Sequence, residues 1–177
     1  LQDSVFSNLL TGKSTINLTE ILNEPGKILV VRLNSYKMLE TLQPIGRFII
    51  SLIMSVAFQR NEISEKDRIS THLIIDEASM FIGDGIEVIL EQARKFRLYL
   101  LLASQQNSQY PKAIESSILS NTAIKVVGMN SHRNHTVMSK EINTSIDDLL
   151  TLNKKGEFFI KIANKPAIKF RVSDRLF

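Results

Sequence analysis

Cysteine is absent from the 177 residues, and its absence excludes several kinds of site at once. The chain can have no disulfide framework, no thiolate metal site and no cysteine nucleophile. A reducing compartment suits such a chain, but a protein without cysteine is compatible with any location.

Long apolar runs and long basic runs are missing too. The longest apolar stretch, residues 48–58, is interrupted by Ser51 and Ser55 and falls short of the roughly 20 residues that a membrane span needs. We therefore expect no membrane segment in this chain. Its first residues carry no signal-peptide pattern, and the first is not Met, so we expect a piece of a longer protein. The net charge of +4 permits an anionic partner but is weak evidence for one.

Short apolar segments that alternate with amphipathic segments dominate what is present. The apolar segments predict short strands at residues 27–33, 72–75, 98–103 and 123–127, of which the first has the pattern of a strand buried on both faces. The amphipathic segments predict helices at residues 43–60, 86–96 and 111–119. This alternation is typical of an α/β fold, in which a mainly parallel sheet is flanked by helices.

We expect a single domain in three stretches. Residues 1–24 form a helical lead-in, in which Thr19 is a candidate helix cap. Residues 25–130 form the sheet core. Residues 131–177 form two short helices and a C-terminal antiparallel hairpin, with strands at 157–162 and 167–172 around Asn164-Lys165-Pro166.

Polar side chains follow three of the predicted strands, where an open parallel sheet binds its ligands. Asn34 and Ser35 follow the first strand, Asp76 and Glu77 the second, and Gln105 the third. An apolar strand that runs into Asp-Glu is the Walker B pattern of nucleotide-hydrolysing proteins. There, the Asp holds Mg²⁺ beside the phosphates and the Glu polarises a water. Two solvated acids at a strand end, capping the next helix, are the alternative.

Gln105 strengthens this hypothesis, because an amide at the end of the neighbouring strand can sense the γ-phosphate of a nucleotide. Gln106 and Gln109 are alternative amides for that role. A loop glutamine bonded to the backbone is the structural alternative. The two motifs together favour a nucleotide site more than either does alone.

A second phosphate motif fails on its context. Residues 11–15, Thr-Gly-Lys-Ser-Thr, match the end of a Walker A loop, but Ser7 stands where the pattern needs a glycine. No buried strand precedes the segment, and we interpret it as a polar turn. The chain then lacks the phosphate-binding lysine.

Arg94 ends the predicted helix after Walker B. Its spacing alone favours an interaction with the helix dipole or with Glu91 over an arginine finger that reaches a neighbour's ATP. His72, His132 and His135 form no metal-ligand pattern, and we expect them on the surface.

The order of these segments resembles the C-terminal half of the RecA-like motor domain in the FtsK/HerA superfamily of DNA-pumping ATPases. The segments are LIIDEASMFI, EQARKFRLYLLLASQQ, SSILSNTAIKVVGMNS and LLTLNKKGEFFIKI. Within the superfamily, the chain is most similar to the coupling-type ATPases of conjugation and type IV secretion. The resemblance runs from about Ser14 to the C-terminus.

The resemblance implies a role for each matching residue. Asp76 matches the Mg²⁺-binding acid, Glu77 the catalytic acid, and Gln105 the sensor glutamine. Arg94 matches an arginine that faces the nucleotide of the adjacent subunit. This match favours the arginine-finger role more than its spacing alone does. Lys125 stands where some relatives have another arginine, and its role stays open.

The function implied is an ATPase that uses ATP and Mg²⁺ to move DNA through a hexameric ring, at the cytoplasmic face of the inner membrane. Secretion-channel or relaxosome proteins are the implied partners, and residues 130–135 are a weak candidate for DNA contact. Without a Walker A lysine, this chain alone is expected to be inactive. The alternatives are a non-catalytic RecA-like assembly module and a secretion ATPase that moves protein.

Overall fold

The computed structural model describes residue 11 and residues 14–33, 41–83, 90 and 92–173. Contacts divide the chain into two compact units, Leu1–Ser104 and Gln105–Phe177. Each unit has its own sheet and its own helices, and each is described by itself.

The long helix α3, Leu42–Gln59, organises the first unit and confirms the helix predicted at 43–60. Its apolar stripe packs against the short helix α2, Leu18–Asn23, against α4, Ala78–Phe81, and against the 3₁₀ turn η3, Ala93–Phe96. The residues that α3 buries are Leu42, Ile45, Gly46, Ile50, Ile53, Met54, Val56 and Ala57.

Helix α3 also begins a longer helical stretch with membrane-like composition. Among the described residues, Leu42–Glu62 alone is long and apolar enough to cross a bilayer, and 44% of its apolar window is buried inside the protein. A core helix passes the same test, and α3 is the helix against which α2, α4 and η3 pack. The stretch continues through the 3₁₀ turn η1, Arg60–Glu62, and a second turn, η2, covers Glu65–Asp67.

The cap of α2 differs from the prediction. The helix begins at Leu18, and the side chain of Asn17 accepts a hydrogen bond from the Glu20 N–H at 3.2 Å. Thr19 therefore lies inside the first turn and is not the cap. Asn is among the best N-cap residues, because its short side chain reaches the free N–H groups of that turn.

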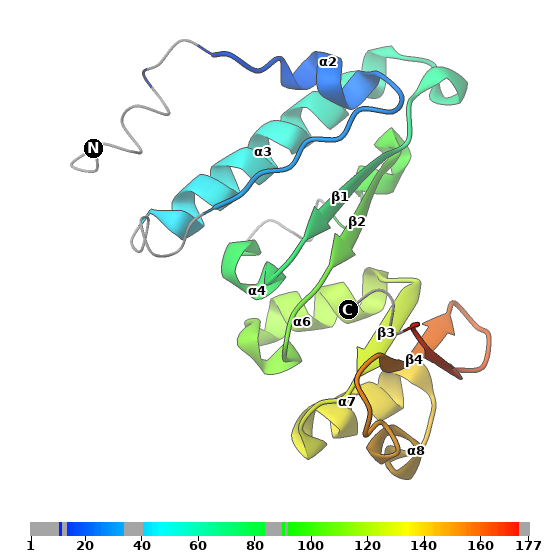
Figure 1. The fold of residues 1–177 in the computed structure, drawn as a ribbon. Helices are drawn as coiled ribbons and strands as arrows, with labels where there is room; N and C mark the ends of the chain where they lie inside the picture. Colours follow the sequence, from blue (N-terminus) through cyan, green and yellow to red (C-terminus); the bar gives the residue numbers. More distant parts are fainter. Residues whose placement is uncertain (1–10, 12–13, 34–40, 84–89, 91, 174–177) are drawn as a thin grey trace. The chain divides into compact units, whose positions relative to one another are not determined.

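Two of the predicted strands form a parallel pair, as Figure 1 shows: β1, Thr71–Ile75, and β2, Leu98–Leu102. The register pairs Ile75 with Leu102, so the two strands end level with each other. The residues that follow both strands therefore leave the sheet at the same edge.

The strand predicted at 27–33 is wrong. These residues have no strand partner in the described part of the chain, where β1 is bonded to β2 alone. Ile28 is 89% exposed and Val30 is 82% exposed. The apolar run and its β-branched residues favour an extended backbone here, but a strand also needs a hydrogen-bonded neighbour.

The β1–β2 sheet is covered on one face only. Ile75 and Leu98 are buried in the first unit, whereas Ile74 is 66% exposed and its partner Leu101 is 55% exposed. The predicted burial of these apolar strands therefore holds for one face of the sheet, while the other face is largely exposed.

The second unit carries the predicted helices and hairpin in the expected order. The turn η4, Asn107–Gln109, leads into helix α6, Lys112–Asn121, and strand β3, Ile124–Gly128. Helices α7, His132–Ile142, and α8, Ile146–Leu150, follow. Strands β4, Glu157–Ile162, and β5, Ile168–Arg171, close the chain.

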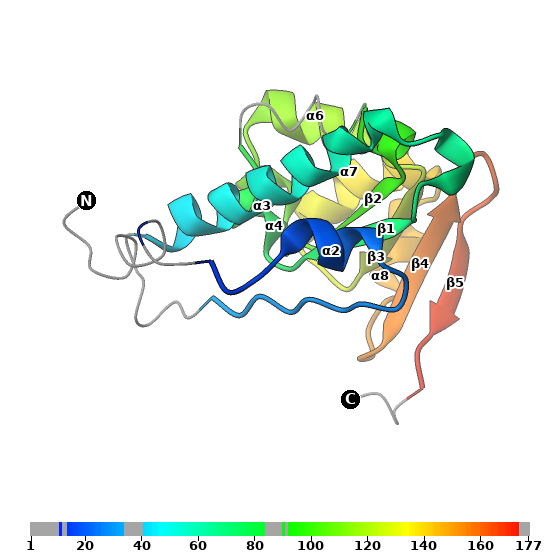
Figure 2. The same cartoon turned by 90° about the horizontal axis from the view of Figure 1, so that it is seen from above.

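The alternating pattern predicted that β3 would extend the parallel sheet. The described residues show a different arrangement. There, β3 pairs antiparallel with β4, and β4 pairs antiparallel with β5, which Figure 2 shows as neighbouring arrows of opposite direction. The two helices between β3 and β4 reverse the chain, so an antiparallel neighbour becomes available and satisfies the backbone groups of β3.

One face of this sheet packs against α7 and α8. The buried cluster consists of Val127, Met138, Ile142, Leu149, Leu152 and Phe159. Helix α8 is capped by Ser145, whose Oγ accepts from the Asp148 N–H at 2.9 Å and donates to Asp148 Oδ2 at 2.7 Å. That hydroxyl lowers the pKa of the Asp148 carboxyl below its ordinary value.

Candidate nucleotide site

Asp76 and Glu77 form a tight turn directly after β1. The Asp76 side chain folds back on this turn, where Oδ1 accepts a hydrogen bond from the Glu77 N–H at 3.0 Å. Asp76 is exposed and Glu77 is half-buried. The turn thus presents two carboxyl groups at the carboxyl end of the strand, as predicted.

Glu77 has an unusual backbone. Its φ of 48° and ψ of 45° lie in the left-handed region, which is rare for residues other than glycine, asparagine and aspartate. For an L-residue this conformation costs about 1–2 kcal/mol. Strained residues cluster at functional sites, where the surrounding structure holds them in place.

Backbone hydrogen bonds to the neighbouring strand hold this turn. Ala103 N–H donates to Ile75 O at 3.0 Å, and Ala78 N–H donates to Ala103 O at 2.8 Å. Ala78 is fully buried, and Met80 N–H donates to Glu77 O at 2.9 Å. The residues on both sides of Glu77 are therefore fixed, and Glu77 has little freedom to leave the left-handed region.

The turn fits a magnesium ion that is shared with a nucleotide. No group of three or more metal-ligating side chains occurs among the described residues, so an ion held by the protein alone has no site there. Mg²⁺ in nucleotide enzymes is usually held by one or two carboxylates, with phosphates and waters as its other ligands. Asp76 is exposed and is the residue that could hold it.

Gln105 begins the second unit, three residues after β2 ends. The side chain of Asn130, from the loop after β3, donates a hydrogen bond to the Gln105 carbonyl. The backbone of Gln105, the predicted sensor, is thus bonded to another segment of the second unit.

The two alternative glutamines have a structural role. Gln106 and Gln109 form a reciprocal capping box at η4, in which the side chain of each accepts a hydrogen bond from the backbone of the other. The Gln106 N–H donates to Gln109 Oε1 at 3.3 Å. The amides of Gln106 and Gln109 therefore stabilise the start of η4, and the assignment of Gln105 as the sensor stays a prediction.

Arg94 lies on η3 with an exposed side chain, and its own segment is held by other arginines. Arg60 Nη1 donates to Phe96 O at 3.0 Å, and Arg68 Nη1 donates to Lys95 O at 2.7 Å. The carbonyls on the C-terminal side of Arg94 are thus anchored, while its guanidinium remains at the surface. Glu91, its possible partner on the predicted helix, lies outside the residues whose side chains are described.

Sequence patterns did not identify Arg60 as important. It is 1% exposed, and its other hydrogen bonds reach Asn23 Oδ1, Leu22 O and Thr71 Oγ1. Burial lowers the pKa of this guanidinium below its ordinary value. The one signal in the sequence is its position, since an arginine directly after an apolar helix suits a group that bonds to exposed backbone carbonyls.

Other predicted residues lie partly outside the described structure. Asn34, Ser35, Gly12 and Lys13 fall in segments that are not described. Ser14 has no regular secondary structure, and its hydroxyl donates to Ile16 O at 3.0 Å. The helix that follows, α2, is six residues long, and because Gly12 and Lys13 lie outside the described residues, the interpretation of residues 11–15 as a polar turn stays a prediction.

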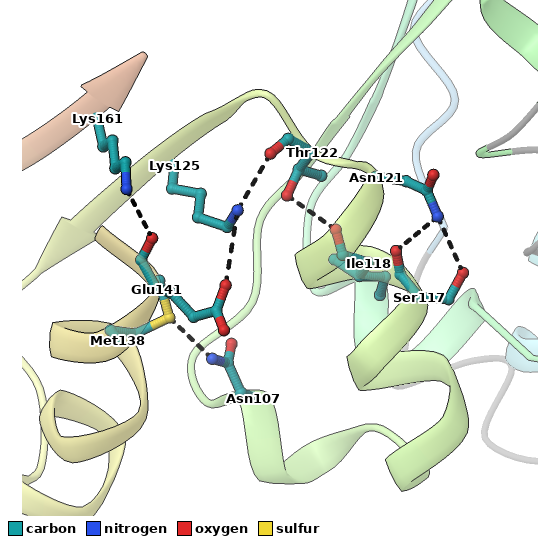
Figure 3. Close-up of polar contacts among 9 residues, drawn as sticks. All are labelled: Asn107, Ser117, Ile118, Asn121, Thr122, Lys125, Met138, Glu141 and Lys161. Atoms are coloured by element: carbon teal, nitrogen blue, oxygen red, sulfur yellow. Dashed lines mark hydrogen bonds and ion pairs between the residues drawn. The ribbon is translucent and has the colours of Figure 1, made fainter. Parts of the chain in front are cut away.

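Lys125, whose role stayed open, lies near the amino end of β3. Figure 3 shows its ammonium between the Thr122 carbonyl, at 3.2 Å, and the Glu141 carboxylate, at 3.7 Å. The Lys161 ammonium donates to Glu141 O at 3.3 Å. The two lysines bind carbonyls where α6 and α7 end, and they line a polar pocket of about 250 Å³. Lys125 therefore stabilises helix ends, at the opposite end of its strand from Asn130.

We predicted that all three histidines lie on the surface, and this is only partly right. His132 is exposed at the start of α7, and His72 stacks on Tyr99 with ring centroids 5.4 Å apart. His135 is buried, with Nε2 3.3 Å from Gly128 O. The surface prediction is wrong for His135, because its position on α7 faces the β3 strand end.

Comparison with known proteins gives a likeness of fold. No protein-family model matches the chain, and no curated protein matches its sequence. Among solved structures, the plasmid coupling protein TrwB in complex with a non-hydrolysable GTP analogue matches with a TM-score of 0.72 and 16% identity. The match covers 89% of this chain and 43% of that one.

Two further matches come from other systems. VirB4 of Thermoanaerobacter pseudethanolicus has a TM-score of 0.54 and 19% identity, over 77% of this chain and 39% of that one. The genome-packaging NTPase B204 of Sulfolobus turreted icosahedral virus 2 has a TM-score of 0.59 and 17% identity, over 94% of this chain and 76% of that one.

These matches confirm the predicted α/β fold class, and they show that the chain is similar in fold to the plasmid coupling protein TrwB, to VirB4 and to a genome-packaging NTPase. The chain spans less than half the length of the coupling protein that it matches.

Proposed function

We propose that this chain is the C-terminal half of an ATP-hydrolysing motor domain that moves DNA, as in conjugative transfer. The observation that carries the proposal is Glu77, held in a left-handed conformation beside Asp76 at the carboxyl end of β1. A catalytic acid needs a fixed orientation, and the hydrogen bonds that join Ile75 and Ala78 to Ala103 hold the turn around Glu77 in one conformation.

Each residue has a defined role in the proposed reaction. Asp76 would hold Mg²⁺, which when bound neutralises charge on the phosphates. Glu77 polarises the attacking water through its carboxylate. Gln105 orients that water or contacts the γ-phosphate, and Arg94 reaches the nucleotide of an adjacent subunit in a ring, which we propose to be hexameric.

The phosphate-binding lysine belongs elsewhere in this proposal. Residues 11–15 lack the features of a phosphate loop, and TrwB, with the same fold, is more than twice as long as the matched segment. We propose that the complete protein supplies a Walker A loop and acts at the cytoplasmic face of a membrane, with relaxosome or secretion-channel proteins as partners. The 177-residue chain by itself would then hydrolyse no ATP.

The proposed substrate is DNA. The likeness to a plasmid coupling protein and to a genome-packaging NTPase supports it. The likeness to VirB4 and to the type VII secretion ATPase EccC favours a second candidate, a motor for protein. Contacts to DNA phosphates release counterions, so affinity for DNA should fall steeply as salt rises. Measurement of DNA affinity between 50 and 200 mM salt separates the two candidates. For a DNA motor that makes six phosphate contacts, the affinity should fall roughly 10³-fold over this range.

The catalytic assignment is tested by Glu77→Gln in the complete protein. Glutamine keeps the size of the side chain but cannot act as a base. We expect turnover to fall by at least about 100-fold while ATP binding is kept. Asp76→Asn is the matched variant, and we expect it to weaken Mg²⁺-dependent nucleotide binding as well. Unchanged turnover in Glu77→Gln would contradict the proposal and favour a non-catalytic assembly module.

A further inference from the structure

Two asparagines after β3 hold the backbone that carries Gln105. Asn130 donates from Nδ2 to the Gln105 carbonyl, and Asn134 accepts at Oδ1 from the Asn107 N–H at 3.2 Å. These side chains thus bracket the backbone on both sides of residue 106. All of these residues belong to the second unit.

Local structure aims both asparagines at this segment. Asn130 folds against its own loop, where Oδ1 accepts from the Ser131 N–H at 2.7 Å, and this contact leaves the amide nitrogen to donate to Gln105. Asn134 lies in the first turn of α7, which Ser131 caps by accepting from the Asn134 N–H. Both side chains are half-buried.

A third contact comes from further along α7. Asn107 Nδ2 donates to Met138 Sδ at 2.9 Å, as Figure 3 shows. Met138 belongs to the core cluster that α7 forms with the sheet. The segment from Gln105 to Asn107 is therefore hydrogen-bonded at three points to α7 and to the loop before it.

We infer that Asn130 and Asn134 are positioning residues that set the backbone, and hence the side-chain direction, of Gln105. The inference rests on the proposed role of Gln105 as the nucleotide sensor. A sensor must report a change of about one ångström at a phosphate, so its backbone has to be fixed to a rigid element. Here that element is α7, whose start also carries the exposed Arg133.

The decisive variant is Asn130→Asp in the complete protein. Aspartate keeps the acceptor for Ser131 N–H but has no N–H to donate, and it turns an oxygen toward the Gln105 carbonyl. We expect kcat for ATP to fall roughly tenfold while KM changes less than about twofold, because the sensor acts after binding. Asn134→Ala removes the acceptor for the Asn107 N–H, and we expect kcat to fall in this variant as well.

Asn121→Asp is the matched control. Asn121 Nδ2 donates to Ser117 O at 3.0 Å on the exposed end of α6, so this variant removes the same kind of amide-to-carbonyl bond within another helix of the second unit. We expect wild-type turnover in it. Thermal unfolding of every variant should agree within a few degrees, which separates positioning from loss of the fold.

Gln105→Ala distinguishes the possible failures. If Gln105→Ala lowers turnover and Asn130→Asp does not, the positioning role is overturned while the sensor survives. If Asn130→Asp and Asn121→Asp lower kcat equally, the effect is general damage, and the inference again fails. If Gln105→Ala itself has no effect, the sensor role falls and the inference falls with it.

Discussion

At the scale of single residues, side chains with several hydrogen bonds join segments that lie far apart in the sequence. Arg60 does this in the first unit with hydrogen bonds to α2, β1 and η3. The patterns that predicted Asp76, Glu77 and Gln105 could not reveal it, since an arginine after a helix is common and its acceptors lie 11 to 38 residues away. Contacts at such separations are a property of the fold.

We predict that Arg60→Met destabilises the chain by about 3 kcal/mol. Methionine fills much of the space but leaves several buried acceptors without a donor, and each such group costs about 1–3 kcal/mol. Urea unfolding measures the change in the free energy of unfolding. Lys66→Met, in the exposed turn η2, is the control, and we expect a change within about 0.5 kcal/mol. An equal, small effect in both variants would contradict a structural role for Arg60.

At the scale of elements, helix α3 fixes the position of α4, the helix that follows Glu77. Gly46 on α3 allows the approach, since a Cβ at this position would lie 2.3 Å from the ring of Phe81 on α4. The periodic stripe in the sequence predicted α3 well, because one continuous face of it is buried. It could not show that one glycine in that stripe is a contact point.

We predict that Gly46→Ala lowers stability by about 1–2 kcal/mol, although alanine favours a helix over glycine by about 1 kcal/mol. The overlap with the Phe81 ring outweighs this gain, because a Cβ 2.3 Å from a ring atom forces the half-buried ring or α4 itself to move. Unfolding free energies in a double-mutant cycle provide the test.

Phe81→Leu should remove much of the penalty, so Gly46→Ala should cost less in that background. Gly26→Ala is not a suitable control, because Gly26 has a φ of 76° and would be strained for its own reason. A penalty of the same size with Phe81 and with Leu at position 81 would show that the ring is not the cause.

At the scale of the whole molecule, each sheet has one covered face and one apolar face that is largely exposed. Ile74 and Leu101 lie on that face of the first sheet, and Ile124, Val126 and Ile168 lie on that of the second. The apolar composition of the strands predicted their position in a sheet but not that one face of each sheet is exposed.

We predict that the 177-residue chain alone binds Mg²⁺-ATP more weakly than about 1 mM, which corresponds to about 4 kcal/mol. Asp76, Glu77 and Gln105 contact only the far end of a nucleotide in the proposed site, and no phosphate loop is evident. Titration calorimetry of the chain, with the complete protein as the positive control, provides the measurement. Micromolar binding by the chain alone would show that it contains a phosphate-binding site after all.

By itself, the sequence determined the elements whose signals are local. The stripe of α3, the apolar runs of β1 and β2, the acids after β1 and the hairpin of β4 and β5 all depend on residues close together in the chain. Periodicity and turn chemistry describe such segments well, because burial of a face repeats with the backbone geometry.

Tertiary structure decided everything that depends on a partner. It left residues 27–33 without a strand neighbour, paired β3 antiparallel with β4, and set Glu77 in its left-handed turn by bonds from β2 to the residues on either side. It also brought two asparagines to the Gln105 segment. Asn130 bonds to Gln105, 25 residues away in the chain, and Asn134 bonds to Asn107, 27 residues away. A hydrogen bond between distant residues needs both to be in place, and only the folded chain specifies that.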